Sequence, residues 1–165
     1  MGVNEVTSKE WVFRAGLPLG GVLSPSLFLL WAAPLVDALQ AVPGVSAFMY
    51  ADDTASLCTG NDITVSLERA QRASDALVNW ARRSKMTVAP ANTQVLVLSQ
   101  SHRDTAGVTV MVGGQAVPAG GTLSLLGVTL DRRLQFGPHC RRLRNRVRPR
   151  LDQLRQIRRA KLWAR

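Results

Sequence analysis

Two adjacent carboxylates, Asp52 and Asp53, are the residues of this chain best suited to chemistry. They lie between two apolar, β-prone runs, 45–50 and 54–59, a pattern that predicts a strand-turn-strand hairpin with its acids at the tip. Like charges repel, and burying them without a partner is costly. A divalent cation relieves the repulsion, because Mg²⁺ and Mn²⁺ prefer carboxylate oxygens. The pair therefore predicts a metal site, with a solvated turn, where Asp is common, as the plainer alternative.

A glycine-rich loop and a predicted helix precede this hairpin. The loop contains residues that let the backbone bend or approach a ligand closely: Gly16, Pro18, Gly20 and Gly21. Ser24 followed by Pro25 predicts a helix start, with a hydroxyl N-cap and proline in the first turn. The predicted helix, 25–40, is apolar nearly all round, so we expect it to be buried, and Pro34 should kink or break it. A plain turn before a core helix is the alternative for this loop.

The rest of the pattern predicts an α+β fold. An amphipathic helix is expected over 63–85, capped by Asn61 or Asp62, as cover for a sheet. Further strands are expected at residues 3–14, 86–89, 93–99, 108–112, 115–117 and 123–130.

The net charge of +10 is concentrated at the C-terminal end. Residues 141–165 have eleven Lys and Arg and one acid, whereas residues 1–140 have ten of each sign. A helix is expected from residue 137 onward, with Pro149 breaking it. Its basic residues include Arg141, Arg142, Arg144, Arg146, Arg148 and Arg150. Such a helix predicts a polyanionic partner, most simply a nucleic-acid backbone; a solvated charged face is the alternative.

Cysteine use and hydropathy limit the remaining possibilities. Cys58 and Cys140 are too few for a disulfide framework, no Cys/His grouping has zinc spacing, and His139 beside Cys140 is interpreted as incidental. The most apolar run, 27–33, is too short to span a membrane, and no signal peptide is visible. We therefore expect an intracellular protein without a membrane partner. The oligomeric state is left open.

The loop, the predicted helix and the Asp hairpin together resemble the palm of a reverse transcriptase. The family pattern is G-x-P-Q-G-S-x-x-S-P-x-L-F followed by a Y-A-D-D hairpin. The matching residues of the first part are Gly16, Pro18, Gly20, Ser24, Pro25, Leu27 and Phe28, and those of the second are Tyr50, Ala51, Asp52 and Asp53. Non-LTR (LINE-type) retrotransposons are the most similar branch. The resemblance extends over nearly the whole chain.

The resemblance implies an RNA-directed DNA polymerase and divides the chain in two. Residues 1–136 would form a partial polymerase palm, an antiparallel sheet with helices on one face, and residues 137–165 the basic start of a thumb. The partners would be an RNA template, a DNA primer and deoxynucleoside triphosphates. A nuclear location would follow from that role.

The family also assigns roles to residues of this chain. Asp52, and less directly Asp53, would hold the catalytic Mg²⁺ or Mn²⁺ ions. Tyr50 and Ala51 would lie near the primer end, and a primer grip at Leu126, Gly127 and Val128 would hold the primer backbone. Gly16, Pro18 and Gly20 would shape the loop beside the template and the incoming nucleotide. The arginines of the basic helix would contact backbone phosphates of the template–primer duplex.

Five departures from the family pattern argue against activity of this chain alone. The family has another catalytic carboxylate upstream of the loop, but the upstream acids here, Glu5 and Glu10, lack its context. The other departures are Leu19 for Gln, Gly21 for Ser, Asn92 for Lys, and Pro34 within the helix. We therefore expect an incomplete and inactive polymerase fragment. The alternatives are a non-catalytic nucleic-acid-binding remnant that uses the basic tail, and a poorly folded fragment.

Overall fold

The computed structural model describes residues 2–3, 6–7, 16–18, 20–99 and 107–162. This part of the chain contains helices separated by hairpins and runs of short strands, so the predicted α+β class is confirmed. In chain order the elements are β1 (Gly2–Val3), β2 (Val6–Thr7), α1 (Ser24–Gln40), β3 (Val45–Tyr50), β4 (Asp53–Cys58), α2 (Ile63–Arg83), the 3₁₀ turn η1 (Pro90–Asn92), β5 (Val95–Leu96), β6 (Thr109–Val112), β7 (Gln115–Gly120), β8 (Thr122–Leu125), β9 (Val128–Asp131) and α3 (Gly137–Leu162).

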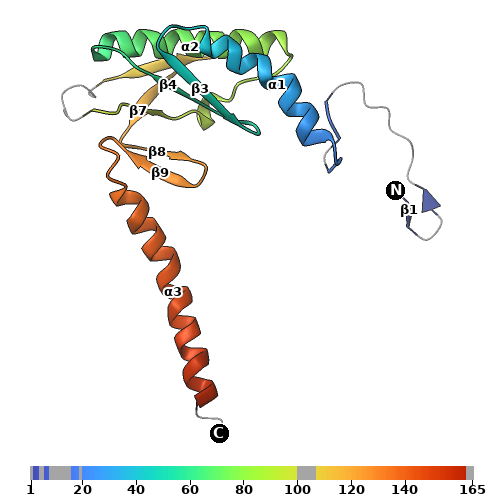
Figure 1. Ribbon diagram of the computed structural model, residues 1–165, viewed down its shortest axis with the longest axis vertical. Coiled ribbons are helices and arrows are strands. Elements are labelled where there is room, and N and C mark those ends of the chain that lie inside the picture. Colours follow the sequence, from blue (N-terminus) through green and yellow to red (C-terminus); the bar gives the residue numbers. More distant parts are fainter. Residues whose placement is uncertain (1, 4–5, 8–15, 19, 100–106, 163–165) are drawn as a thin grey trace.

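The described strands are divided among several small sheets. The pairs β1–β2, β3–β4 and β8–β9 are antiparallel hairpins, and a third strand joins the β6–β7 hairpin as β5–β7–β6. The β5–β7 pair is parallel. Helices α1 and α2 lie together on one side of these strands, and α3 extends away on the other side (Figure 1).

Helix α2 joins two apolar clusters. Asp62 caps it, as one of the two predicted candidates, by accepting a 2.8 Å hydrogen bond from the backbone N–H of Val65. The first cluster combines Ala73 of α2 with residues of α1, of β3 and of the connection between them, namely Leu35, Leu39, Val42, Val45 and Ala47. The second combines Leu67, Ala70 and Val78 of α2 with Val110, Val112 and Val117 of the β6–β7 hairpin. This arrangement confirms the prediction that the helix covers a sheet.

Helix α1 differs from its prediction in three respects. It is continuous through Pro34, so the predicted break does not occur, and the alternative of a kink stays a prediction. Its N-cap is Leu23, and the hydroxyl of Ser24 bonds elsewhere. Only Ala32, Leu35 and Leu39 are buried, because the helix contacts β3 and α2 along one side. The expectation of burial all round is therefore wrong, and Leu30 is 74% exposed.

The C-terminal half also departs from expectation. The segment 123–130, predicted as one strand, is the hairpin of β8 and β9, because Leu126 and Gly127 form a turn. Residues 86–89 have no regular structure. Helix α3 runs through Pro149 without interruption, so the break predicted there is also wrong. Trp11, Val12 and Phe13, predicted as the apolar part of an N-terminal strand, lie outside the described residues.

Candidate functional site

The Asp pair lies at the tip of the β3–β4 hairpin, as the sequence predicts. Tyr50 pairs with Asp53, so Ala51 and Asp52 are the two turn residues. Ala51 has a positive φ of 51°, which is unusual for a residue with a Cβ atom and costs about 1–2 kcal/mol. That turn places Asp52 and Asp53 at the open end of the hairpin, where both residues are exposed.

The two faces of this hairpin have different environments. Val45 and Ala47 are buried and Met49 packs against the same cluster, which anchors one face. The other face contains the alternate residues Phe48 and Tyr50, which are 61% and 68% exposed. Asp53 lies on this second face, because it is directly opposite Tyr50 in the register. The carboxylates therefore border an aromatic surface that is accessible to a ligand.

The donor chemistry of this tip fits a hard cation, but the ligand set is incomplete. Asp52 and Asp53 could supply carboxylate oxygens to Mg²⁺ or Mn²⁺. Within the described ranges, no three or more His, Cys, Asp or Glu residues are grouped so as to hold a metal ion. Any ion at the tip would therefore need further ligands from outside these residues or from solvent and substrate.

The glycine-rich loop closes onto the start of α1. The carbonyl oxygen of Pro18 accepts hydrogen bonds from the Gly21 N–H at 3.2 Å and from the Ser24 hydroxyl at 2.8 Å. Gly16 and Gly20 both have positive φ values, 88° and 83°. A Cβ atom at Gly21 would lie 2.6 Å from the Ser24 Oγ atom, so glycine suits this position where the family pattern has serine. Leu19 lies outside the described residues.

The residues predicted as a primer grip form the tip of a second hairpin, β8–β9. Leu126 and Gly127 are its turn residues and both have positive φ, 47° and 83°, as a type I′ turn requires. Leu126 is 55% exposed and Val128 is 36% exposed. The structure therefore presents these residues to solvent at a tight turn, as it does the Asp pair.

Polar contacts join the β8–β9 hairpin to the first turns of α3. The guanidinium of Arg142 donates to the carbonyl oxygen of Gly127, and the Thr129 N–H donates to His139 Nδ1 at 3.2 Å. Between the two elements, Asp131 Oδ1 accepts hydrogen bonds from the backbone N–H groups of Arg133 and Gln135, each at 3.1 Å. The interpretation of His139 as incidental is therefore wrong, and no spacing rule links a histidine to a strand ten residues earlier.

These backbone donors also act on the ionisation of Asp131. Desolvation acts to raise its pKa, but the N–H groups of Gln135, Arg133 and Phe136 outweigh that effect and hold the pKa below its ordinary value. The charged carboxylate is thus the form that organises the turn between β9 and α3.

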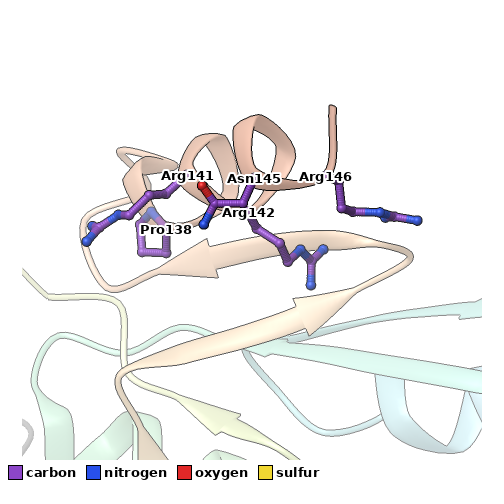
Figure 2. Close-up of a pocket in the computed structure, with 5 residues that line it drawn as sticks. All are labelled: Pro138, Arg141, Arg142, Asn145 and Arg146. Carbon is purple, nitrogen blue, oxygen red and sulfur yellow. The ribbon is translucent and has the colours of Figure 1, made fainter. Parts of the chain in front are cut away.

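Helix α3 exposes the arginines that the sequence predicted as backbone contacts, Arg141, Arg142, Arg144, Arg146, Arg148 and Arg150. A groove of about 590 Å³ lies along its first turns and is lined by Pro138, Arg141, Arg142, Asn145 and Arg146 (Figure 2). Asp152, six residues after Arg146, pairs with Arg155 at 3.4 Å. Among the described helices, none is both long and apolar enough to cross a membrane.

Comparison with known proteins agrees with this geometry. Residues 2–130 match the family described as reverse transcriptase (RNA-dependent DNA polymerase). The chain is 30% identical over 150 residues to the probable RNA-directed DNA polymerase from transposon BS of Drosophila melanogaster, covering 88% of the chain and 17% of that protein. It is 29% identical over 146 residues to the RNA-directed DNA polymerase from mobile element jockey of Drosophila funebris, covering 86% and 16%.

The chain thus spans about a sixth of the length of these relatives. No solved structure matches it. The family match includes the glycine-rich loop, the Asp hairpin and all but the last residue of the β8–β9 hairpin, and it extends over more than half of the sequence. The chain therefore belongs to the reverse transcriptase (RNA-dependent DNA polymerase) family.

Proposed function

We propose that this chain is the part of a non-LTR retrotransposon reverse transcriptase that provides two carboxylates of the polymerase metal site. The observation that supports this proposal is the tight turn of the β3–β4 hairpin. It presents Asp52 and Asp53 side by side, next to an exposed aromatic face, within the region that matches the family. The activity served would be RNA-directed DNA polymerisation, and the location would be intracellular, in the nucleus.

Each exposed feature has a role in this proposal. Mg²⁺ or Mn²⁺ bound by Asp52 and Asp53 would lower the pKa of the primer 3′-hydroxyl and neutralise the leaving pyrophosphate. The exposed face of Tyr50, with Ala51 beside it, would receive the primer end. The loop at Gly16, Pro18 and Gly20 would border the incoming deoxynucleoside triphosphate and the RNA template.

The C-terminal features would hold the duplex. The turn at Leu126, Gly127 and Val128 would contact the primer backbone, because it is exposed and Arg142 of α3 holds it through the Gly127 carbonyl oxygen. The arginines of α3 would contact phosphates of the template–primer without reading its sequence. In this proposal, residues 1–136 belong to the polymerase palm and residues 137–165 form the start of the thumb.

We further propose that this chain alone does not polymerise. A two-metal site needs more oxygen ligands than one hairpin supplies, and the described residues offer no third acid near the pair. The chain corresponds to about a sixth of each relative, so the rest of such a protein would provide the missing carboxylate.

Primer extension with the purified chain, an RNA template, a DNA primer and Mg²⁺ or Mn²⁺ tests the proposal. We expect no extension, together with weak Mn²⁺ binding that disappears in Asp52→Asn and persists in Asp37→Asn. Asp37 is an exposed acid on α1, so its substitution changes the charge equally at a distant site. Extension that Asp52→Asn abolished would overturn the inactivity and support the metal site. Equal Mn²⁺ binding by both variants would overturn the metal site itself.

The exposed arginines of α3 favour a second function, non-catalytic nucleic-acid binding. Residues 141–165 combine eleven basic residues with the single acid Asp152. Binding of a labelled RNA–DNA duplex should fall steeply with salt and should be lost when residues 141–165 are deleted. Failure of the intact chain to bind at low salt would exclude this function.

A further inference from the structure

The junction between β9 and the first turns of α3 contains a contact that depends on a titratable group. The backbone N–H of Thr129 donates to His139 Nδ1 at 3.2 Å, and both residues are half-buried. In a neutral imidazole one ring nitrogen accepts a hydrogen bond and the other donates, whereas in the protonated ring both nitrogens donate. The contact with Thr129 therefore exists only while His139 is neutral and has its proton on Nε2.

Two oxygen atoms without partners lie on one side of this junction. Thr129 and Asp131 project from the same face of β9, because they are two residues apart in a strand. Thr129 Oγ1 and Asp131 Oδ2 are both shielded from solvent, and in the described part of the chain neither has a hydrogen-bond partner. Buried polar atoms in folded proteins are nearly always paired. A protonated imidazole beside Thr129 would supply the donor that these oxygens lack.

The Asp131 carboxylate is drawn toward the helix that contains His139. Its Oδ1 atom accepts hydrogen bonds from the backbone N–H groups of Arg133 and Gln135, which lead into α3. His139 follows Gln135 by four residues and already reaches β9 through Thr129. Although desolvation acts to raise the pKa of Asp131, the backbone donors hold it below its ordinary value. The carboxylate is therefore charged over the pH range in which a histidine ordinarily titrates.

The other charged groups at this junction are arginines, and they oppose a positive charge on His139. Arg142 lies on the same side of α3, three residues after His139, and its guanidinium donates to the carbonyl oxygen of Gly127. The connection between β9 and α3 adds two arginines that have contacts of their own, Arg132 and Arg133. Cys140 follows on a different side of the helix, since successive residues are about 100° apart. Asp131 supplies the negative charge that favours a protonated ring.

We propose that His139 is a proton-sensitive positioning residue for the β8–β9 hairpin. The neutral ring accepts the Thr129 N–H and fixes the hairpin to α3. The protonated ring gives up that N–H and donates to the oxygens without partners, with Asp131 Oδ2 as the charged acceptor. The hairpin is thus held at neutral pH and is freer in mild acid. Its effect on a primer rests on the proposed function, in which the turn at Leu126, Gly127 and Val128 contacts the primer backbone.

Two further contacts hold the same hairpin and do not titrate near neutral pH. The Ser124 N–H donates to Gln94 Oε1 at 2.9 Å, and the guanidinium of Arg142 donates to the carbonyl oxygen of Gly127. A side-chain amide does not ionise, and an arginine keeps its proton in proteins. Release of the histidine contact should therefore expose the Thr129 amide and leave the Ser124 amide protected, whereas general loosening of the hairpin would expose both.

Hydrogen exchange of the full chain, followed by NMR without nucleic acid and corrected for intrinsic rates, tests the switch. The two conditions are about pH 7.5 and about pH 5.5, on either side of the ordinary pKa of histidine. We expect protection of the Thr129 amide to fall roughly fivefold at the lower pH, the effect of losing one ordinary hydrogen bond. The Ser124 amide should not change. Equal falls at both amides, or none at Thr129, would overturn the proposal.

Two substitutions separate the titrating ring from its acceptor. His139→Asn keeps an acceptor that cannot be protonated, so protection of Thr129 should be the same at both pH values; a fall as large as in the unchanged chain would overturn the proposal. If this variant does not fold, the comparison of Thr129 with Ser124 in the unchanged chain still decides. In Asp131→Asn the acid-induced fall should be smaller, because the protonated ring loses its charged acceptor. An equal fall would overturn the role of Asp131.

These measurements fail independently of the proposed function, because no template, primer or metal ion is present. A switch that worked in a chain unable to bind an RNA–DNA duplex would leave the histidine mechanism intact and remove its effect on a primer. A chain that bound the duplex but showed no acid-induced change at Thr129 would overturn the switch and leave the metal site and the duplex contacts as proposed.

Discussion

The β3–β4 and β8–β9 hairpins each present a two-residue turn to solvent, but different interactions hold them. The first hairpin has one face buried against α1 and α2, with Val45 and Ala47 at 7% and 3% exposure. The second has no residue in either buried cluster and is attached through polar contacts to Arg142 and His139 of α3 and to Gln94. The Asp tip is thus fixed by packing, whereas the Gly127 tip is fixed by hydrogen bonds, two from α3 and one that the Ser124 N–H donates to Gln94 Oε1.

Because packing holds one hairpin and hydrogen bonds hold the other, we expect the two tips to differ in mobility. Apolar packing around Ala47 is spread over many contacts, so the Asp pair keeps its position unless that part of the core opens. A few hydrogen bonds to α3 can exchange with solvent or ligand at small cost in free energy. We therefore expect the β8–β9 tip to respond to what binds α3, and the β3–β4 tip to remain still.

Removing a core side chain should have the largest effect. Leu39 is 1% exposed in the cluster that supports β3, so Leu39→Ala should cost about 2–5 kcal/mol in the free energy of unfolding. Leu30→Ala, at 74% exposure on the same helix, is the control and should change it by less than about 0.5 kcal/mol. Urea denaturation measures both. Equal losses of unfolding free energy in the two variants would contradict the idea that core packing supports β3. The same idea would fail if Leu39→Ala raised hydrogen exchange at the β8–β9 amides as much as at the β3–β4 amides.

The first hairpin could be predicted from the sequence because its signals are local. Alternating apolar residues define β3, and the two acids interrupt the apolar pattern where the chain turns. The capping residue Asp62 and the apolar periodicity of α2 are local in the same sense. Even the unusual φ of Ala51 follows from a two-residue turn once the register is known.

The second hairpin could not be predicted, because its determinants are distant or atypical. Leu126-Gly127 is not among the usual turn pairs, since leucine rarely adopts a positive φ. The contacts from His139 and Arg142 connect residues 10 and 15 positions apart. Similarly, the exposure of α1 depends on which other elements pack against it. Hydropathy alone predicts burial of an apolar helix and does not show whether other elements cover each of its faces.

Removing the histidine contact should have an intermediate effect. His139→Leu leaves the half-buried Thr129 N–H without its acceptor, which should cost about 1 kcal/mol of local stability. The Thr129 amide should then exchange with deuterium roughly five times faster, because 1 kcal/mol corresponds to about that factor. His139→Asn keeps an acceptor at a similar reach and serves as the control. Unchanged exchange in His139→Leu would show that packing, not this bond, holds the hairpin.

Acid should loosen the turn between β9 and α3, with the smallest effect of the three. The folded pKa of Asp131 is lowered by backbone N–H donors, so the carboxylate adds stability above its ordinary pKa and loses it as the pH falls through the lower, folded value. Hydrogen exchange at the Arg133 and Gln135 amides, compared at neutral pH and below the ordinary Asp range, should show this loss after correction for intrinsic rates.

The effect should be confined to one turn, because the backbone groups that donate to Asp131 Oδ1, the N–H groups of Arg133 and Gln135, lie in that segment. Asp131→Asn supplies the control, since its amide oxygen still accepts from those N–H groups but does not titrate. The variant should therefore show no change with acid. If it responded to acid as the unchanged chain does, the titrating group would lie elsewhere. The attachment of the β8–β9 hairpin would then depend on Arg142, His139 and Gln94, without help from the turn between β9 and α3.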